Sequence, residues 1–108
     1  MDNIFNLPES LPDKELFETL HNNKNVSIER IISTGQTTPP GQWYDQETDE
    51  WVILLQGKAE LSYADGSKIK LRAGDYVFIA ARQKHRVEYT SCEPPCIWLA
   101  VHLNIEQK

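Results

Sequence analysis

The sequence has few cysteines and no long apolar run. Cys92 and Cys96 are its only two cysteines, and Pro94 and Pro95 lie between them. Their C-x3-C spacing matches neither a redox C-x-x-C motif nor a four-ligand zinc site, so we interpret them as free thiols. No stretch approaches the roughly 20 apolar residues that a membrane-spanning helix needs. We therefore expect no membrane partner.

Basic residues are also scarce. Lys and Arg number 11 against 16 Asp and Glu, and the formal net charge is -5. The basic residues are scattered, whereas binding to a phosphate backbone needs a continuous basic stripe. We therefore expect no nucleic-acid partner. The start of the chain, MDNIFNLPESLPDKE, lacks the basic region and apolar core of a secretory signal, which predicts a cytoplasmic protein.

The first part of the chain differs in pattern from the rest. A chain of 108 residues suffices for one hydrophobic core and is too short for two. Within residues 1–25, Asp13 is placed to cap a short helix from Lys14 to His21. One face of that helix would carry Leu16, Phe17 and Leu20. We expect an N-terminal extension whose helix packs on the outside of the main body, with His21 exposed.

The remainder, residues 26–108, has the pattern of one all-β domain. It contains short β-type runs separated by turn residues, with no helical period longer than one turn. The expected strands are Val26–Ser33, Gln42–Asp45, Glu50–Gln56, Lys58–Ala64, Lys68–Arg72, Tyr76–Ala81, His85–Thr90 and Ile97–Leu103. Asp65-Gly66 predicts a hairpin, because both positions tolerate positive φ. Periodicity alone does not decide between a sandwich and a barrel.

Two of the expected strands are apolar on both faces. They are the runs from Trp51 to Leu55 and from Ile97 to Val101. Such a strand faces the interior on one side and a covering element on the other. In a chain of this length the covering element can be another subunit, so we expect a homodimer.

Two glycine-bounded segments carry the most specific pattern. Residues 41–57 read GQWYDQETDEWVILLQG, and residues 74–85 read GDYVFIAARQKH. They resemble the paired motifs of the cupin family, and within it a branch of short bacterial single-domain cupins. In the first motif a polar ligand strand precedes a glutamate, six residues and a glycine; in the second, Gly-Asp precedes an apolar strand and a histidine. The resemblance implies a double-stranded β-helix, a barrel of the jelly-roll type.

The resemblance also implies a site. In metal-binding cupins, two histidines and the glutamate of the first motif hold the ion together with the histidine of the second. The matching positions here are Tyr44, Gln46, Glu50 and His85. Tyrosine and glutamine replace the two histidines of the first motif, which gives a weaker, oxygen-rich donor set. The implied cofactor is a divalent metal ion, with zinc, nickel, manganese and iron all open.

Further residues are candidates for the wall of the same pocket. His102 alternates with Trp98 in the last expected strand, so both are placed to enter the interior. Trp43 either walls the pocket or is covered by the N-terminal segment. His102 either joins the site or is a core histidine with a hydrogen-bonded partner. A β-bulge would bring Asp45 or Asp49 into the pocket in place of the glutamine.

Three functions remain open at this point. The first is a metal-dependent enzyme of unknown reaction that binds a small polar molecule, since the fold does not choose a chemistry. The second is a metal-free binding module for a small, sugar-like ligand. The third is a structural or dimeric scaffold, in which the apparent site is a buried polar network. For the single residues, the alternatives to a functional role are an exposed carboxylate at a strand start for Glu50 and a satisfied histidine at the barrel mouth for His85.

Overall fold

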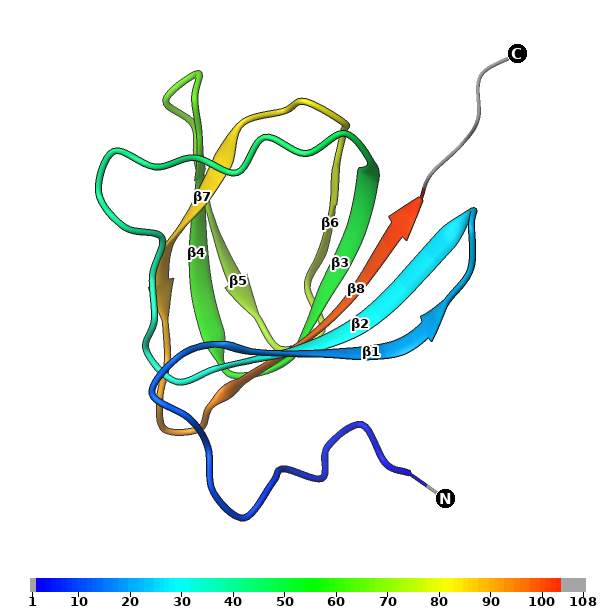
Figure 1. Cartoon of the computed structure of the whole chain (residues 1–108). Coiled ribbons are helices and arrows are strands. Elements are labelled where there is room, and N and C mark those ends of the chain that lie inside the picture. The colour runs from blue at the N-terminus through cyan, green and yellow to red at the C-terminus, as the bar shows by residue number, and fades with distance from the viewer. Residues whose placement is uncertain (1, 104–108) are drawn as a thin grey trace.

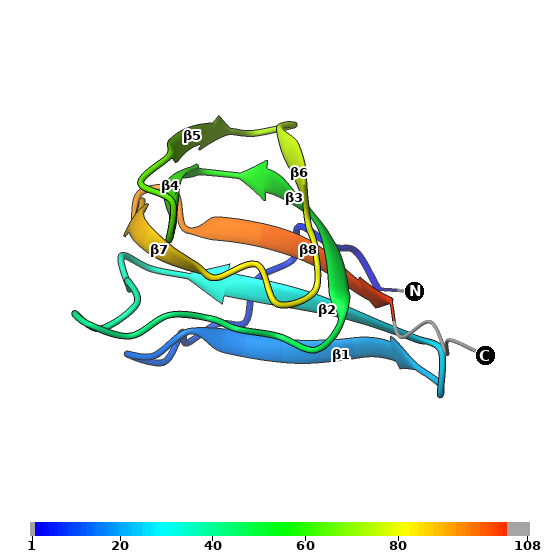
Figure 2. The ribbon, with the colours of Figure 1, turned by 90° about the horizontal axis from the view of Figure 1, so that it is seen from above.

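The protein folds as two antiparallel β-sheets. The computed structural model describes residues 2–103. One sheet has the strand order β1-β2-β8-β3-β6 and the other the order β5-β4-β7. The strands are β1 (Leu16–Asn22), β2 (Val26–Ser33), β3 (Asp49–Gln56), β4 (Lys58–Tyr63), β5 (Lys68–Arg72), β6 (Tyr76–Ile79), β7 (His85–Thr90) and β8 (Cys96–Leu103). The sheets converge at the bottom of Figure 1 and spread apart toward the top. Figure 2, seen from above, shows β1, β2 and β8 lying side by side in one sheet. Within residues 2–103 the structure holds no helix that could cross a lipid bilayer.

The predicted helix from Lys14 to His21 is wrong, because this segment forms the edge strand β1. Strand β1 pairs antiparallel with β2, with Phe17 opposite Ile31 and Glu18 opposite Arg30. A helix of two turns has few internal hydrogen bonds, whereas pairing with β2 satisfies backbone groups along the whole segment. The apolar spacing that suggested a helical face is therefore overridden by the edge of the sheet.

The chain before β1 is held on the outside of the same sheet. The Arg30 guanidinium donates hydrogen bonds to the backbone oxygens of Ile4 and Asn6, at 3.0 and 2.6 Å, and pairs with the carboxylate of Glu18. In the expected extension, residues 1–25, the described residues before Leu16 therefore lie outside the sheet. The second part of the extension, from Leu16 onward, is a strand of the five-stranded sheet.

The predicted strand Gln42–Asp45 is also wrong. Residues 34–48 form a long loop that crosses the wide end of the molecule (Figure 1). The loop is tied to β7 by an antiparallel bridge, in which the N–H of Tyr44 donates to the oxygen of His85 at 2.8 Å and the reverse bond is 3.1 Å. Pro39-Pro40 lies directly before this segment, and proline cannot donate to a strand ladder. The bridge fixes one loop residue beside the second motif.

The other predicted strands are confirmed to within two residues at each end. The hairpin at Asp65-Gly66 joins β4 and β5, with Gly66 at φ 93°. A second turn lies between β3 and β4, where Gly57 alone separates the strands and has φ 93°. Only glycine adopts such a conformation without strain. Gly57 is the glycine that ends the first motif. At this turn the chain passes from one sheet to the other.

The hydrophobic core lies between the two sheets and borders the cavity. Its buried residues come from both sheets and are Val52, Leu54, Ala59, Leu61, Leu71, Ile79, Cys96, Trp98 and Ala100. Strand β3 alternates between the two faces, so Glu50 lies on the same inner face as Val52 and Leu54. The same strand therefore supplies apolar side chains to the core and a carboxylate to the wide end.

The outer face of the five-stranded sheet exposes aromatic side chains. Tyr76 is 64% exposed and Phe78 is 55% exposed. The rings of Trp51 and Tyr76 lie with their centroids 5.5 Å apart. Trp51 belongs to a strand whose outer face was expected to be covered, and Tyr76 and Phe78 belong to the adjacent strand β6. The homodimer stays a prediction, and this face is where we expect it to form.

Candidate functional site

Glu50 and His102 lie side by side on the inner face of the five-stranded sheet. Strand β3 pairs with β8 so that these two residues are direct cross-strand partners. On its other side Glu50 is opposite Ile79 of β6. Glu50 is 7% exposed. The register therefore fixes a nearly buried carboxylate between an imidazole and an aliphatic side chain.

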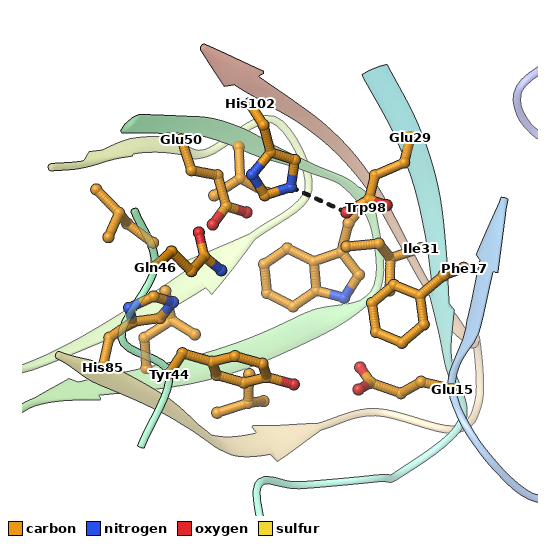
Figure 3. A pocket seen from close by; sticks show the side chains of 14 residues that line it. Glu15, Phe17, Glu29, Ile31, Tyr44, Gln46, Glu50, His85, Trp98 and His102 are labelled. Carbon is orange, nitrogen blue, oxygen red and sulfur yellow. Dashed lines mark hydrogen bonds and ion pairs between the residues drawn. The ribbon is translucent and has the colours of Figure 1, made fainter. Parts of the chain in front are cut away.

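His102 is held by a second carboxylate from β2. Its Nε2 lies 2.9 Å from Oε1 of Glu29, which projects from the neighbouring strand (Figure 3). This bond raises the pKa of His102 above its ordinary value, against the opposing effect of burial, and the charge of Glu50 adds to the rise. A hydrogen bond to a carboxylate favours the charged imidazolium. His102 is therefore a partnered histidine that also borders the cavity.

His85 and Tyr44 approach from the opposite sheet and the loop. His85 is buried in β7, and its Nδ1 lies 3.0 Å from the backbone oxygen of Gln83. That contact leaves Nε2 as the ring nitrogen with no hydrogen-bond partner among residues 2–103. The Tyr44 ring stacks on the imidazole, with centroids 5.4 Å apart and planes 21° from parallel. In Figure 3 the tyrosine hydroxyl points away from His85, toward Glu15.

Gln46, a loop residue of the first motif, has an incompletely satisfied side chain. Its backbone oxygen accepts a hydrogen bond from the N–H of Arg82 at 2.7 Å, which ties the loop to the β6–β7 connection. Its side-chain oxygen Oε1 is buried and has no hydrogen-bond partner in the part of the chain that the structure describes. In Figure 3 the Gln46 side chain lies between Glu50 and His85. A buried acceptor without a donor is costly, so this position favours a bound proton donor or cation.

The strand that replaced the predicted helix supplies a further wall. Glu15, which directly precedes β1, and Phe17, which lies in β1, project inward, and both line the cavity (Figure 3). The Ser33 hydroxyl donates to Oε2 of Glu15 at 2.7 Å, and Nε1 of Trp98 donates to the Ser33 oxygen at 3.2 Å. This chain of hydrogen bonds fixes the Glu15 carboxylate beside the indole ring.

These side chains enclose one cavity of about 80 Å³. It is lined by Glu15, Phe17, Glu29, Ile31, Tyr44, Gln46, Glu50, Val52, Leu61, Ile79, His85, Val87, Trp98 and His102. Since one water needs about 10 to 15 Å³ measured in this way, the space holds several waters or a small molecule. The cavity has a polar end at Glu50, Gln46 and His85. Its other end combines carboxylates with aromatic rings.

The electrostatics of this cavity centre on Glu50. Burial raises the pKa of the Glu50 carboxyl above its ordinary value. The neighbouring His102 and His85, and a hydrogen bond with Gln46, oppose this rise without cancelling it. Burial also raises the pKa of Tyr44, and the charges of Glu15 and Glu50 add to that effect. A carboxyl group with a raised pKa can hold or release a proton near neutral pH.

The structure brings most of the sequence-predicted residues together. Tyr44, Gln46, Glu50, His85, Trp98 and His102 all line the cavity. Trp43 does not; it lines a separate shallow hollow, and the Arg86 guanidinium lies 5.8 Å from its ring centroid. The alternatives Asp45 and Asp49 are engaged elsewhere, with Arg82 and with the backbone N–H of Ala81.

Besides aliphatic lining residues, sequence reasoning missed the carboxylates of Glu15 and Glu29 and the ring of Phe17. Glu15 and Phe17 share a face only in a strand, so the helix prediction hid them. Glu29 alternates with Ile31 and Ser33 in β2, and this period-two spacing was the pattern that could have found it.

The side chains present offer a divalent metal ion fewer donors than a metal-binding cupin does. Within residues 2–103 no group of three or more His, Cys, Asp and Glu side chains is arranged to hold an ion. The buried Oε1 of Gln46 lies beside Glu50 and His85 and is a third candidate donor (Figure 3). The Tyr44 hydroxyl faces the other end of the cavity (Figure 3). This set of mainly oxygen donors fits a weakly held divalent ion.

The contact between Glu29 and His102 gives a testable expectation. Replacing Glu29 by glutamine removes the charge that favours the imidazolium, so the pKa of His102 is expected to fall. Titration of the histidine ring protons by NMR would measure it, with Glu9→Gln as the control at an exposed site outside the cavity. An unchanged His102 titration in Glu29→Gln would contradict the assigned contact.

The comparisons with known proteins agree with this architecture. Residues 30–102 match the family model described as the Cupin domain. A crystal structure from Ralstonia eutropha JMP134, described as a "putative mannose-6-phosphate isomerase", shares 41% identity over 97% of this chain and 98% of its own, with a TM-score of 0.88. No curated protein matches the chain.

More distant structures share the fold. A cupin superfamily protein from Desulfitobacterium hafniense DCB-2 is 20% identical, covers 91% of this chain and 84% of its own, and has a TM-score of 0.75. An RmlC-like cupin with a double-stranded β-helix from Methanocaldococcus jannaschii is 15% identical over 95% and 91%, with a TM-score of 0.69. These similarities support the predicted barrel topology.

Proposed function

This chain belongs to the cupin domain family, and we propose that its barrel binds one divalent metal ion together with a small polar molecule. The observation that carries the proposal is the unpartnered Gln46 oxygen beside the nearly buried Glu50 carboxylate. Two acceptors in a low-dielectric site favour a positive charge between them. His85 would complete the donor set through its free ring nitrogen. Tyr44 would position His85 by stacking rather than bind the ion.

The chemistry of such a site is proton transfer on the bound molecule. A divalent ion would polarise an oxygen of that molecule or lower the pKa of a bound water. Glu50 would accept or release a proton at its carboxylate, because its raised pKa lies closer to neutral pH. An isomerase needs this kind of step, and the 41% identical protein is described as a candidate for one. The substrate of this chain is a separate question.

A second candidate is metal-free binding of a small polar ligand. It is favoured by the lack of a third histidine or carboxylate within bonding reach among the described residues. In that case a protonated Glu50 would donate a hydrogen bond to the ligand or to Gln46. The raised pKa of Glu50 is compatible with this state. The two candidates differ in whether the pure protein takes up a metal ion.

Metal titration distinguishes them. Protein purified without an affinity metal, stripped with chelator and titrated with Mn²⁺, Zn²⁺, Ni²⁺ and Fe²⁺, is expected to bind one ion per chain by calorimetry. At a hundredfold excess over the dissociation constant the ion would add about 2.7 kcal/mol of stability. That corresponds to a rise in Tm of at least about 10 °C for a domain of this size.

The variants test the assigned donors. Glu50→Gln and His85→Ala are each expected to weaken ion binding at least tenfold, because the first removes the negative charge of an oxygen donor and the second removes a donor altogether. His21→Ala is the matched control, since this histidine is exposed on β1 and does not line the cavity. If the wild type takes up no stoichiometric ion, the metal proposal fails and the metal-free candidate stands.

A further inference from the structure

The far end of the cavity is acidic and aromatic. Three carboxylates line the cavity as a whole, from Glu15, Glu29 and Glu50, and two histidines accompany them. Among the described residues, the lining includes no Lys or Arg side chain. Arg30 and Arg86 lie on the neighbouring strands, but they are committed to partners outside the cavity. A ligand in this cavity therefore meets net negative charge.

The three carboxylates differ in how many of their oxygen atoms already have a hydrogen-bond partner. Glu29 is taken up by His102 at 2.9 Å, and Glu50 belongs to the polar end. Glu15 has one oxygen held by Ser33 at 2.7 Å, which leaves its second oxygen with free lone pairs. Figure 3 shows this carboxylate facing the Tyr44 hydroxyl and lying beside the Phe17 ring. Glu15 is thus an oriented acceptor at the end opposite Glu50.

Aromatic rings surround the same point. Phe17 is 53% exposed although it lines the cavity, and Trp98 is fixed by its bond to Ser33. Aromatic faces attract cations, and a carboxylate in the same site adds a charged hydrogen-bond acceptor. Phosphate needs the opposite arrangement, which is a cluster of basic side chains or backbone N–H donors.

We infer that the molecule bound in this cavity carries a protonated amino group, seated between Glu15 and the rings of Phe17, Tyr44 and Trp98. The ligand class is a small amino alcohol or amino sugar, with its hydroxyl groups toward Glu50 and His85. The inference rests on the proposed function for the polar end of the cavity. It excludes a sugar phosphate as the preferred ligand, in contrast to the described substrate of the 41% identical protein.

Matched ligands test the inference. The wild-type protein, with and without saturating Mn²⁺, is titrated by calorimetry with mannosamine, N-acetylmannosamine, mannose and mannose 6-phosphate. A second pair, 2-aminoethanol and ethane-1,2-diol, covers the case of a smaller ligand. Each amine is expected to bind at least tenfold tighter than its neutral counterpart, and mannose 6-phosphate is expected to bind weakest. The inference would be overturned if mannose 6-phosphate bound as tightly as mannosamine or more tightly. It would also be overturned if neither mannosamine nor 2-aminoethanol bound.

One variant locates the charge. Glu15→Gln keeps an acceptor oxygen for Ser33 and removes the negative charge, so the preference for the amines is expected to fall about tenfold. Binding of the neutral ligands should change little. Glu9→Gln is the control, because this residue is exposed and outside the cavity. An amine preference that survives Glu15→Gln would overturn the assigned position. Ion uptake is measured separately, so failure of the metal proposal is distinguishable from failure of this one.

Discussion

Replacing Gly57 by alanine is expected to lower the free energy of unfolding by about 3 kcal/mol. The added methyl group would lie 2.8 Å from Sγ of Cys96 and 2.8 Å from Oγ of Ser91. Overpacking of this kind costs about 1 to 3 kcal/mol, and a left-handed conformation costs a non-glycine residue about 1 to 2 kcal/mol more. Alanine offsets less than about 1 kcal/mol through the unfolded chain.

The neighbours of Gly57 have little freedom to move. Cys96 is fully buried, and its thiol donates to the backbone oxygen of Lys58 at 3.2 Å. The Ser91 hydroxyl accepts from the N–H of Lys58 at 3.1 Å and donates to the oxygen of Pro94 at 2.8 Å. A shift of either side chain would break these bonds. The clash therefore falls on the turn that joins the two sheets.

Gly66 provides the matched control. It has the same φ of 93°, but a methyl group added there would meet no atom within 4 Å. Gly66→Ala is expected to cost about 1 to 2 kcal/mol, from the conformation alone. Urea unfolding would measure both variants, and a fall in Tm of about 4 to 8 °C accompanies each kcal/mol. Equal losses for the two variants would contradict the steric explanation.

The second large effect concerns the pH dependence of stability in the metal-free protein. Because the pKa of Glu50 is raised in the folded state, folding favours its protonated form. This contribution is present below the unfolded pKa of 4.5 and is lost as pH rises through the folded pKa. The raised pKa of His102 acts in the same direction, above its ordinary value of 6.5. Stability is therefore expected to fall as pH rises from weakly acidic to weakly alkaline.

Glu50→Gln separates the two groups. Glutamine has the same shape without the titrating charge, so the variant is expected to be more stable than the wild type at weakly alkaline pH. Its remaining pH dependence should come from His102. Tm measured across this range, with chelator present, gives both slopes. If Tm falls with pH equally steeply in the wild type and in Glu50→Gln, ionisation of Glu50 does not destabilise the folded protein, and the prediction is wrong.

The same variant connects stability to the proposed function. Addition of Mn²⁺ is expected to restore stability to the wild type at alkaline pH, because the ion compensates the ionised carboxylate. Glu50→Gln should gain much less from the ion. His21→Ala should respond as the wild type does. Under the metal-free candidate, no variant would respond to the ion.

Several features of the site could be predicted from residues near one another in sequence. Period-two alternation places Glu50 with the inward residues of its strand, and the two motifs place Glu50 and His85 near each other. The turns at Gly57 and Asp65-Gly66 depend on backbone conformations that few residues adopt. Such features follow from local sterics and hydrogen bonding, which the sequence specifies directly.

Other features depended on contacts between distant segments. The segment from Leu16 has helical spacing, yet it forms a strand because β2 offers an unpaired edge. This pairing brings Glu15 and Phe17 into the cavity, and the bridge between Tyr44 and His85 orients the tyrosine away from the polar end. Local propensity is a weak preference that tertiary pairing overrides.

The sequence by itself determined the all-β class, most of the strands, and the pair of Glu50 and His85 at the polar end. Tertiary structure alone decided which end of the cavity each polar group faces, and that Glu29 rather than Glu50 binds His102. The physical reason is that backbone conformation is set mainly by neighbouring residues. The partners of a buried charge, in contrast, are chosen by strand register and by packing across the whole barrel.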